Sequence, residues 1–287
     1  MAQIENDAVA TVGVPGASAS PLIASLAGPT EFAKARRGDG IDINDFVKSL
    51  TNATQLHTSV FGETWSVNLQ RAIDDAARMK QVIDRVELTQ DYTGNEDNQK
   101  YMRTVKALSN LILSNKYRGS DRDVLFATLG GWDMHADVKA GLATEFKNLN
   151  EALSLFESEM KAQELWDDVT VVALSDFGRT LTANSGEGSG HAWGGHYLMF
   201  GGDVKGGQIL GEYPPDISTN GPVNIGRGRI IPTSSWESIF TGPLQWMGLD
   251  TEDDLDYCMP NRNNTGTIMF TPDQTFKGAR RSLRRSD

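Results

Sequence analysis

The stretch that decides the expected fold of this chain is residues 169–180, which read VTVVALSDFGRT. Its first half is a short apolar run with several β-branched residues, and such a run between polar residues predicts a buried strand. Asp176 and Arg179 follow at once, on either side of Gly178. The sequence therefore places ionisable side chains where a strand gives way to a loop.

An upstream stretch repeats this arrangement. Residues 124–129 read VLFATL and predict a second strand, and the sequence GGWDMH follows at 130–135. Between the two strands, apolar side chains recur at steps of three and four, which predicts a helix over 140–160. A strand, a helix and a strand in succession indicate a crossover unit, so we expect an α/β fold with a mostly parallel sheet flanked by helices.

The rest of the chain is expected to surround this unit. Residues 1–45 are rich in Ala, Gly, Pro and Ser and predict a loop-rich N-terminal segment. An α/β domain is expected at 46–260, and residues 261–287 form a polar tail with a basic end. Within the domain we expect further helices and short strands, at 64–86, 96–117, 236–247, 197–200 and 208–210.

Composition excludes several classes of function. A formal net charge of -11 argues against a general nucleic-acid binder, because phosphate contacts are made mostly by Lys and Arg. The apolar runs are all too short for a membrane span of about 18 residues, and residues 1–19 show no signal peptide. The single cysteine, Cys258, excludes an intrachain disulfide and disfavours a thiolate metal site.

The histidines are the most informative residues for function. The chain has four, and three of them (His135, His191 and His196) lie in the loops that follow the two predicted strands. Aspartate and neutral histidine are ligands that suit zinc and similar divalent ions. Asp133 and His135 are two residues apart on an extended segment and can face the same way, and Asp176 leaves the neighbouring strand. The pattern predicts a metal site made of these residues with His191 or His196.

Each of these residues also has a simpler structural interpretation, which stays open at this point. Asp176 at a strand end fits a cap for the turn that follows, and a histidine in a glycine-rich loop is commonly solvated. Arg179 fits a structural ion pair, or it binds an anionic substrate group such as a phosphate or sulfate with two hydrogen bonds. Asp137 fits a first-turn helix acid as well as a further metal ligand.

These motifs also carry a family resemblance. Five stretches resemble, in order and spacing, successive motifs of the family labelled domain of unknown function 1501, and the resemblance covers residues 22 to about 260. The stretches are 130–135, 175–180, 191–196, 201–207 and 226–233.

That family is similar to the alkaline phosphatase and sulfatase superfamily, whose members hydrolyse phosphate or sulfate esters with divalent metals at the strand ends of a large α/β sheet. The resemblance implies an alkaline-phosphatase-like domain, a zinc or manganese ion and a small anionic substrate. By this resemblance Asp133 and His135 match one metal-ligand motif, and Asp176 matches the aspartate of an Asp-His pair. His191 or His196 matches the superfamily's later histidine.

The chain departs from the superfamily pattern in three ways. Phe177 stands where the second member of the Asp-His pair is expected, and Gly190 stands where relatives often have aspartate. The opening segment, with the first strand and the nucleophile, is expected to be missing. The sequence therefore supports two hypotheses: a metal-dependent hydrolase-like protein, or an inactive binding or scaffold relative (or a truncated fragment) of the same fold. Many relatives are exported, although this chain shows no export signal.

Overall fold

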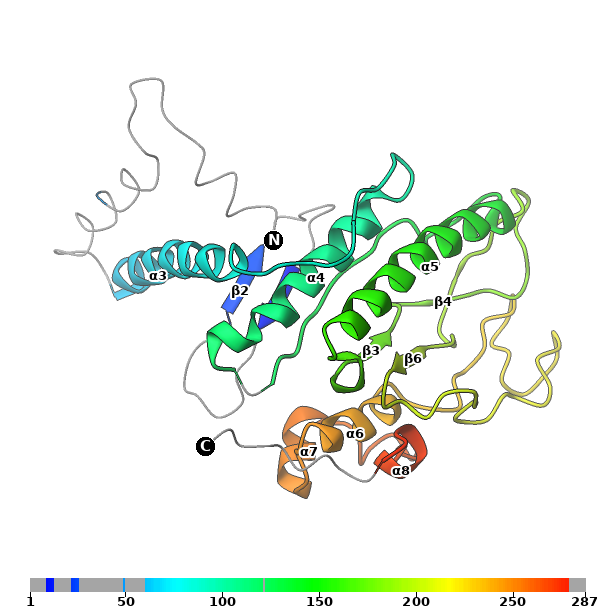
Figure 1. Cartoon of the computed structure of the whole chain (residues 1–287). Helices are drawn as coiled ribbons and strands as arrows, with labels where there is room; N and C mark the ends of the chain where they lie inside the picture. Colours follow the sequence, from blue (N-terminus) through cyan, green and yellow to red (C-terminus); the bar gives the residue numbers. More distant parts are fainter. Residues whose placement is uncertain (1–8, 13–21, 26–48, 50–59, 121, 279–287) are drawn as a thin grey trace. The chain divides into compact units, whose positions relative to one another are not determined.

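The computed structural model describes residues 9–12, 22–25, 49, 60–120 and 122–278 (Figure 1). The chain divides into two compact units. The first consists of residues 1–131 and 147–159, and the second consists of residues 132–146 and 160–287.

Helices dominate the described part of the first unit. Helix α3 spans Val60–Ile83 and helix α4 spans Gln99–Arg118, and the middle of helix α5, Val138–Ala162, belongs to the same unit. Met79 of α3 and Leu111 of α4 are buried together. All three helices were predicted from apolar periodicity, and their presence is confirmed.

The end of α4 follows directly from its sequence. Gly119 adopts the left-handed conformation (φ 64°), and its N–H donates to the carbonyl of Asn115 at 3.1 Å. Glycine takes this conformation without the penalty that a Cβ brings, which makes it the usual helix terminator. The chain can therefore turn away at this point.

Residues 124–129 differ from the prediction. They join no strand ladder among the described residues. Exposure nevertheless alternates along them: Val124 and Phe126 are 56% and 61% exposed, whereas Leu125 packs against the cluster of Met79 and Leu111. Any extended segment with one buried face shows this alternation, because successive side chains point to opposite sides. The sequence pattern therefore indicates an extended segment but does not specify a strand with which it pairs.

The N-terminal segment was expected to be loop, but two of its stretches are strands. Strand β1, Val9–Val12, pairs antiparallel with strand β2, Leu22–Ser25. The rest of 1–45 lies outside the described residues. Strand β1 has three β-branched residues, Val9, Thr11 and Val12, a type that favours strands, although the surrounding Gly and Pro favour loop.

Short antiparallel ribbons form the strands of the second unit. Strand β3, Thr170–Ala173, pairs with β6, Leu198–Gly201, and β4, Gly178–Arg179, pairs with β5, His191–Ala192. A single 3-10 turn, Trp166–Asp168, precedes β3. Strands at 169–174 and 197–200 were predicted. The expected return at 208–210 pairs with no strand that the structure describes, and β6 pairs with β3 instead.

Among the described residues, three more helices belong to the second unit. They are α6, Glu237–Trp246, α7, Glu252–Cys258, and α8, Pro272–Thr275. The helix predicted over 236–247 is confirmed. Part of the predicted tail packs on α6, because Trp246 stacks on Phe276 with ring centroids 5.3 Å apart and Phe276 is buried.

The described residues contain only two-stranded antiparallel sheets. The mostly parallel, alkaline-phosphatase-like sheet therefore stays a prediction, and so do the domain boundaries at residues 46 and 260.

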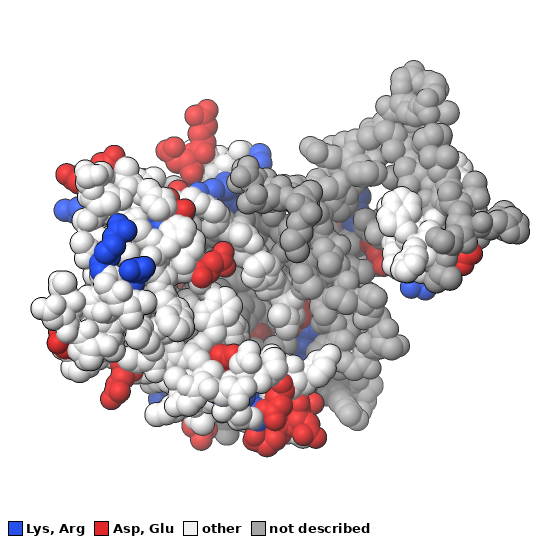
Figure 2. All heavy atoms as spheres, turned by 180° about the vertical axis from the view of Figure 1, so that it is seen from behind, with Lys and Arg blue, Asp and Glu red and all other residues white. Residues whose placement is uncertain are grey.

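The chain is acidic overall, and its described surface carries both acidic and basic side chains. On the face shown in Figure 2, the described Lys and Arg side chains stand in small groups, with acidic groups and uncharged surface between them. In the part of the chain that the structure describes, none of the helices combines the length and apolarity of a membrane-spanning segment.

Candidate metal centre

Two of the sequence motifs meet in the ribbon of β4 and β5. The register places Arg179 opposite His191 and Gly178 opposite Ala192. Gly178 faces the backbone carbonyl of Gly194 so closely that a Cβ at position 178 would overlap it. The glycines of the two motifs therefore allow one backbone to approach the other.

A second pair of loops meets beside this ribbon. The N–H groups of Asp137 and Val138 donate to the carbonyls of Gly186 and Glu187 at 3.0 Å and 3.1 Å. The side chain of Asn184 donates to the carbonyl of His135 at 2.8 Å. The segment that carries Asp133 and His135 is thus joined to the segment that leads into His191.

These contacts bring three of the predicted ligands together. Asp133 Oδ1 lies 2.8 Å from His191 Nε2 and 3.1 Å from His135 Nε2. One ligand atom of each residue lies within 4.8 Å of the other two. The three side chains are 48%, 51% and 58% exposed for Asp133, His191 and His135, so the cluster faces solvent.

The surroundings favour the charged form of Asp133. Desolvation raises the pKa of this carboxyl, but the hydrogen bonds from His191 and Arg179, with the nearby charge of His135, outweigh it. The net pKa of Asp133 lies below its ordinary value. A carboxylate that stays ionised at neutral pH is the form that a divalent cation requires.

Arg179 contacts the protein through several of its nitrogens. Its Nε donates to Ser189 Oγ at 2.8 Å, and its Nη2 donates to the carbonyl of Met134 at 2.5 Å. Further hydrogen bonds run from Nη1 to Asp133 Oδ1 and from Nη2 to the carbonyl of Ser189. The guanidinium therefore lies beside the ligand cluster and is paired with Asp133.

Phe177 has a clear place in the site that sequence reasoning missed. Its ring stacks on the ring of His191 with centroids 3.9 Å apart and planes 9° apart. The guanidinium of Arg179 also lies over the Phe177 ring, with its carbon 5.8 Å from the ring centroid. The sequence marks Phe177 only as a departure from a motif, because its contact with His191 depends on the β4–β5 register. Ser189 was missed for the same reason.

Two other predicted site residues lie elsewhere. Asp176 is exposed and is outside the three-residue cluster. His196 is also exposed, and its ring stacks on Tyr213 at a centroid distance of 5.7 Å. Between the two histidines left open by the sequence, the geometry thus groups His191 with Asp133. Asp176 and His196 as ligands stay predictions.

The cluster has dimensions that suit a small divalent ion. Zinc bonds of about 2.0–2.1 Å in a tetrahedron put ligand atoms roughly 3.3 Å apart. The Asp133–His191 and Asp133–His135 separations of 2.8 Å and 3.1 Å are slightly shorter. For an ion to bind, these two separations would have to lengthen by a few tenths of an ångström, and the ion would take the place of the proton between His191 Nε2 and Asp133 Oδ1.

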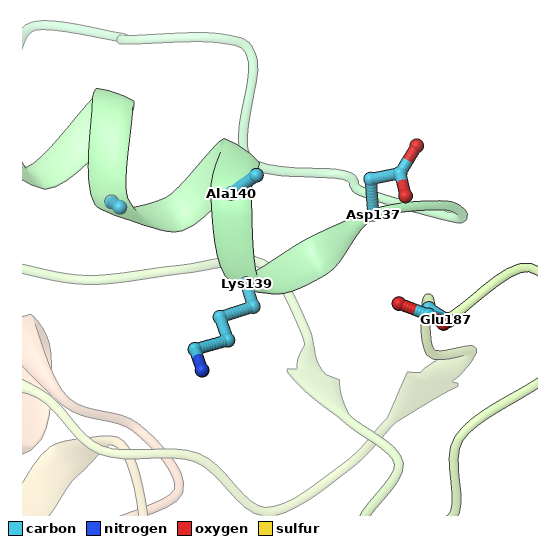
Figure 3. A pocket seen from close by; sticks show the side chains of 5 residues that line it. Asp137, Lys139, Ala140 and Glu187 are labelled. Atoms are coloured by element: carbon cyan, nitrogen blue, oxygen red, sulfur yellow. The ribbon is translucent and has the colours of Figure 1, made fainter.

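An open pocket of about 380 Å³ borders the same pair of loops (Figure 3). It is lined by Asp137, Lys139, Ala140, Ala143 and Glu187. None of the clustered ligands lines it. Asp137 and Glu187 both have left-handed backbone conformations, with φ of 45° and 57°, at the point where the two loops are bonded. The pocket thus lies where the segment after His135 is hydrogen-bonded to the segment before His191, and the backbone is strained at this point.

Comparison with known families agrees with four of the five motifs, since the fifth, residues 226–233, lies just beyond the matched range. The model of the family described as "Protein of unknown function (DUF1501)" matches residues 12–225, well over half of the chain. Among curated proteins and solved structures, no significant match is found. The matched range contains Asp133, His135, Arg179 and His191, and so includes the whole cluster. The chain is a member of the DUF1501 family.

Proposed function

We propose that this chain is a metal-dependent, hydrolase-like protein that holds one divalent ion, zinc or manganese, through Asp133, His135 and His191. The observation that carries the proposal is the convergence of these three ligand atoms within 4.8 Å of one another. Two neutral imidazoles and one carboxylate are a ligand set found in metal centres that act on esters and amides.

The exposure of the cluster supports a reactive site more than a purely structural one. Structural zinc sites are closed by four protein ligands, whereas catalytic sites use three and keep a position for water or substrate. Here three ligands converge at a surface where each is about half exposed. A small anionic ester in solution can therefore approach the ion directly.

The chemistry then divides between the ion and the chain. A divalent ion would polarise a phosphate or sulfate ester oxygen, or lower the pKa of a water molecule, at this position. Asp133 contributes negative charge that offsets the charge of the ion, and the two histidines contribute neutral donors. Phe177 covers one face of the His191 ring and limits its rotation.

A second candidate function is a metal-binding relative without ester turnover. The specific observation in its favour is the set of contacts made by Arg179, whose donors are directed to Asp133, Ser189 and Met134. A guanidinium engaged in this way is poorly placed to hold the anionic group of a substrate. On this alternative the site would bind an ion and serve recognition or stability.

Metal binding tests the feature that both candidates share. We would strip the purified protein with a chelator, reload it with zinc or manganese, and measure stoichiometry by elemental analysis and affinity by titration calorimetry. One ion per chain is expected. Asp133→Ala and His191→Ala should weaken binding at least 100-fold, whereas His196→Ala, a matched change of an exposed histidine in the same motif, should leave it unchanged.

The outcome has a clear negative form. Wild-type protein that holds no ion after loading, or Asp133→Ala protein that binds as well as wild type, would remove the basis of the proposal. Loss of binding in Asp176→Ala would instead add that residue to the ligand set.

Ester turnover separates the two candidates. The loaded protein would be assayed with aryl phosphate and aryl sulfate monoesters. Turnover that disappears in His191→Ala and survives in His196→Ala supports the hydrolase. Stoichiometric metal binding without turnover of either ester class supports the binding relative.

A further inference from the structure

We propose that Arg179 is a positioning residue of the metal site, which fixes Asp133 and the two ligand-bearing segments, and that it does not bind the anionic group of a substrate. This inference rests on the proposed function, since it concerns the ligands named there. It replaces the anion-binding role that the residue type alone suggests.

The hydrogen bonds of Arg179 use most of its donors. A guanidinium has five N–H groups in one plane. Nε serves Ser189 Oγ, Nη1 serves Asp133 Oδ1, and Nη2 serves the carbonyls of Met134 and Ser189. Only one Nη1 hydrogen remains outside these four contacts. A bidentate pair to a phosphate or sulfate needs two adjacent free hydrogens, so it would require existing bonds to break.

The partners of Arg179 are the residues that place the ligands. Met134 lies between Asp133 and His135 in sequence, and Ser189 lies two residues before His191. Arg179 itself is the strand partner of His191 in the β4–β5 ribbon. The Arg179 side chain therefore holds the backbone near all three ligands. This side chain is only 23% exposed.

Arginine geometry and arginine charge act on the site in opposite directions. A permanent positive charge next to a cation site repels the ion and lowers its affinity. A planar fork that orients a ligand raises the affinity, and residues that orient metal ligands are typically worth about 10–100-fold. Lysine keeps the charge but loses the fork, and methionine loses both. The change in metal affinity therefore separates the two effects. Loss of positioning weakens binding in both variants, whereas loss of charge strengthens binding in the methionine variant alone.

The test measures metal affinity in Arg179→Lys and Arg179→Met by competition with a chromophoric chelator, with cobalt as a spectroscopic substitute for zinc. If Arg179 positions Asp133, both variants bind about 10–100-fold more weakly. The visible cobalt spectrum should also change in intensity, because the coordination geometry changes. A general loss of stability would lower the amount of folded protein and leave that spectrum unaltered per bound ion.

Two further variants guard the interpretation. Ser189→Ala removes a single hydrogen-bonding side chain, so folded protein remains for measurement even when Arg179→Met is unstable; a smaller loss of affinity, of a few fold, is expected. Arg229→Lys is a matched control, since Arg229 is exposed and donates to the carbonyls of Gly226 and Ile225. It should bind the ion as wild type does.

The results distinguish this inference from the proposed function. If wild type binds one ion through Asp133 and His191 while Arg179→Lys binds equally well, or Arg179→Met binds more tightly, the positioning role is wrong and the metal site stands. If wild type binds no ion at all, both proposals fail.

Discussion

Replacing Gly188 with alanine places a methyl group inside the backbone that carries a candidate ligand. A Cβ at position 188 would lie 2.5 Å from the backbone nitrogen of Ala136 and closer still to the carbonyl of His135. Ordinary contacts begin at 3.4 Å, and the His135 carbonyl is the nearest obstacle, so the two loops would have to separate by roughly 1 Å or more. The atoms in the way are backbone, which has little freedom to yield.

The consequence for stability can be estimated from the bonds that join the loops. The hydrogen bonds from Asp137 and Val138 to Gly186 and Glu187 measure 3.0 Å and 3.1 Å, and this separation would take both beyond hydrogen-bond range. Each such bond contributes about 1 kcal/mol net. We expect Gly188→Ala to lower the free energy of unfolding by about 2–3 kcal/mol, a range usual for an overpacked site.

The same displacement acts on the metal site, because His135 supplies both the obstructing carbonyl and a ligand. We expect the affinity for zinc or cobalt to fall roughly 10–100-fold, as when the support of a ligand is removed. Calorimetric titration gives the affinity, and urea unfolding followed by circular dichroism gives the stability.

Gly186→Ala is the matched control for this prediction. It lies in the same loop, but its Cβ would meet nothing closer than 3.5 Å. Gly186→Ala should therefore keep wild-type stability and affinity. If Gly188→Ala binds metal and resists urea as wild type does, the loops are not packed as described; equal damage in both variants would refute the steric argument.

Three further predictions concern the first unit. Burial raises the pKa of Tyr92 to about 12. The stability that the neutral tyrosine provides is therefore present below the ordinary pKa of 10.0 and is lost as pH rises from 10.0 toward 12. Tyr92→Phe should remove this part of the pH dependence in urea unfolding. Desolvation raises the pKa of Asp123, but hydrogen bonds, first that from Arg118, hold it below 3.8, so the stability it contributes is present above that value and is lost as pH falls further. Acid unfolding of Asp123→Asn should accordingly be less steep as the pH falls below 3.8. Glu159 is fully buried and accepts hydrogen bonds from the backbone and side chain of Thr89, so Glu159→Ala should lower the unfolding free energy by about 3 kcal/mol, measured by urea titration.

The longer helices, α3 to α6, could be predicted from the sequence because their signal is local, whereas the short helices α7 and α8 were not predicted. Apolar side chains at steps of three and four mark α3, α4 and α5, and a helix then forms wherever that stripe can be buried. Strand pairing is a different matter. The run at 169–174 is apolar on its own, but nothing within it specifies that β3 pairs with β6 and that residues 124–129 pair with no described strand.

The candidate site was predicted in the same uneven way. Asp133 and His135 share a short segment, and their spacing alone indicates that they can face one point. The choice between His191 and His196 depends on the β4–β5 register, which places His191 opposite Arg179. The glycines did hold a usable signal: Gly178 and Gly188 lie where one backbone touches another, because a glycine has no Cβ to keep the two apart.

The distance along the chain between the ligands has a consequence for folding. Asp133 and His191 are 58 residues apart in sequence. An ion held by both would act as a cross-link that closes a long loop, and a link of that length removes about 4 kcal/mol of chain entropy from the unfolded state in the simplest treatment. The ion would thus fasten the fold in the way that a disulfide fastens a secreted domain, in a chain whose single cysteine can form no such bridge. Chelation alone should then lower the unfolding temperature of the protein, whether or not the site turns over an ester.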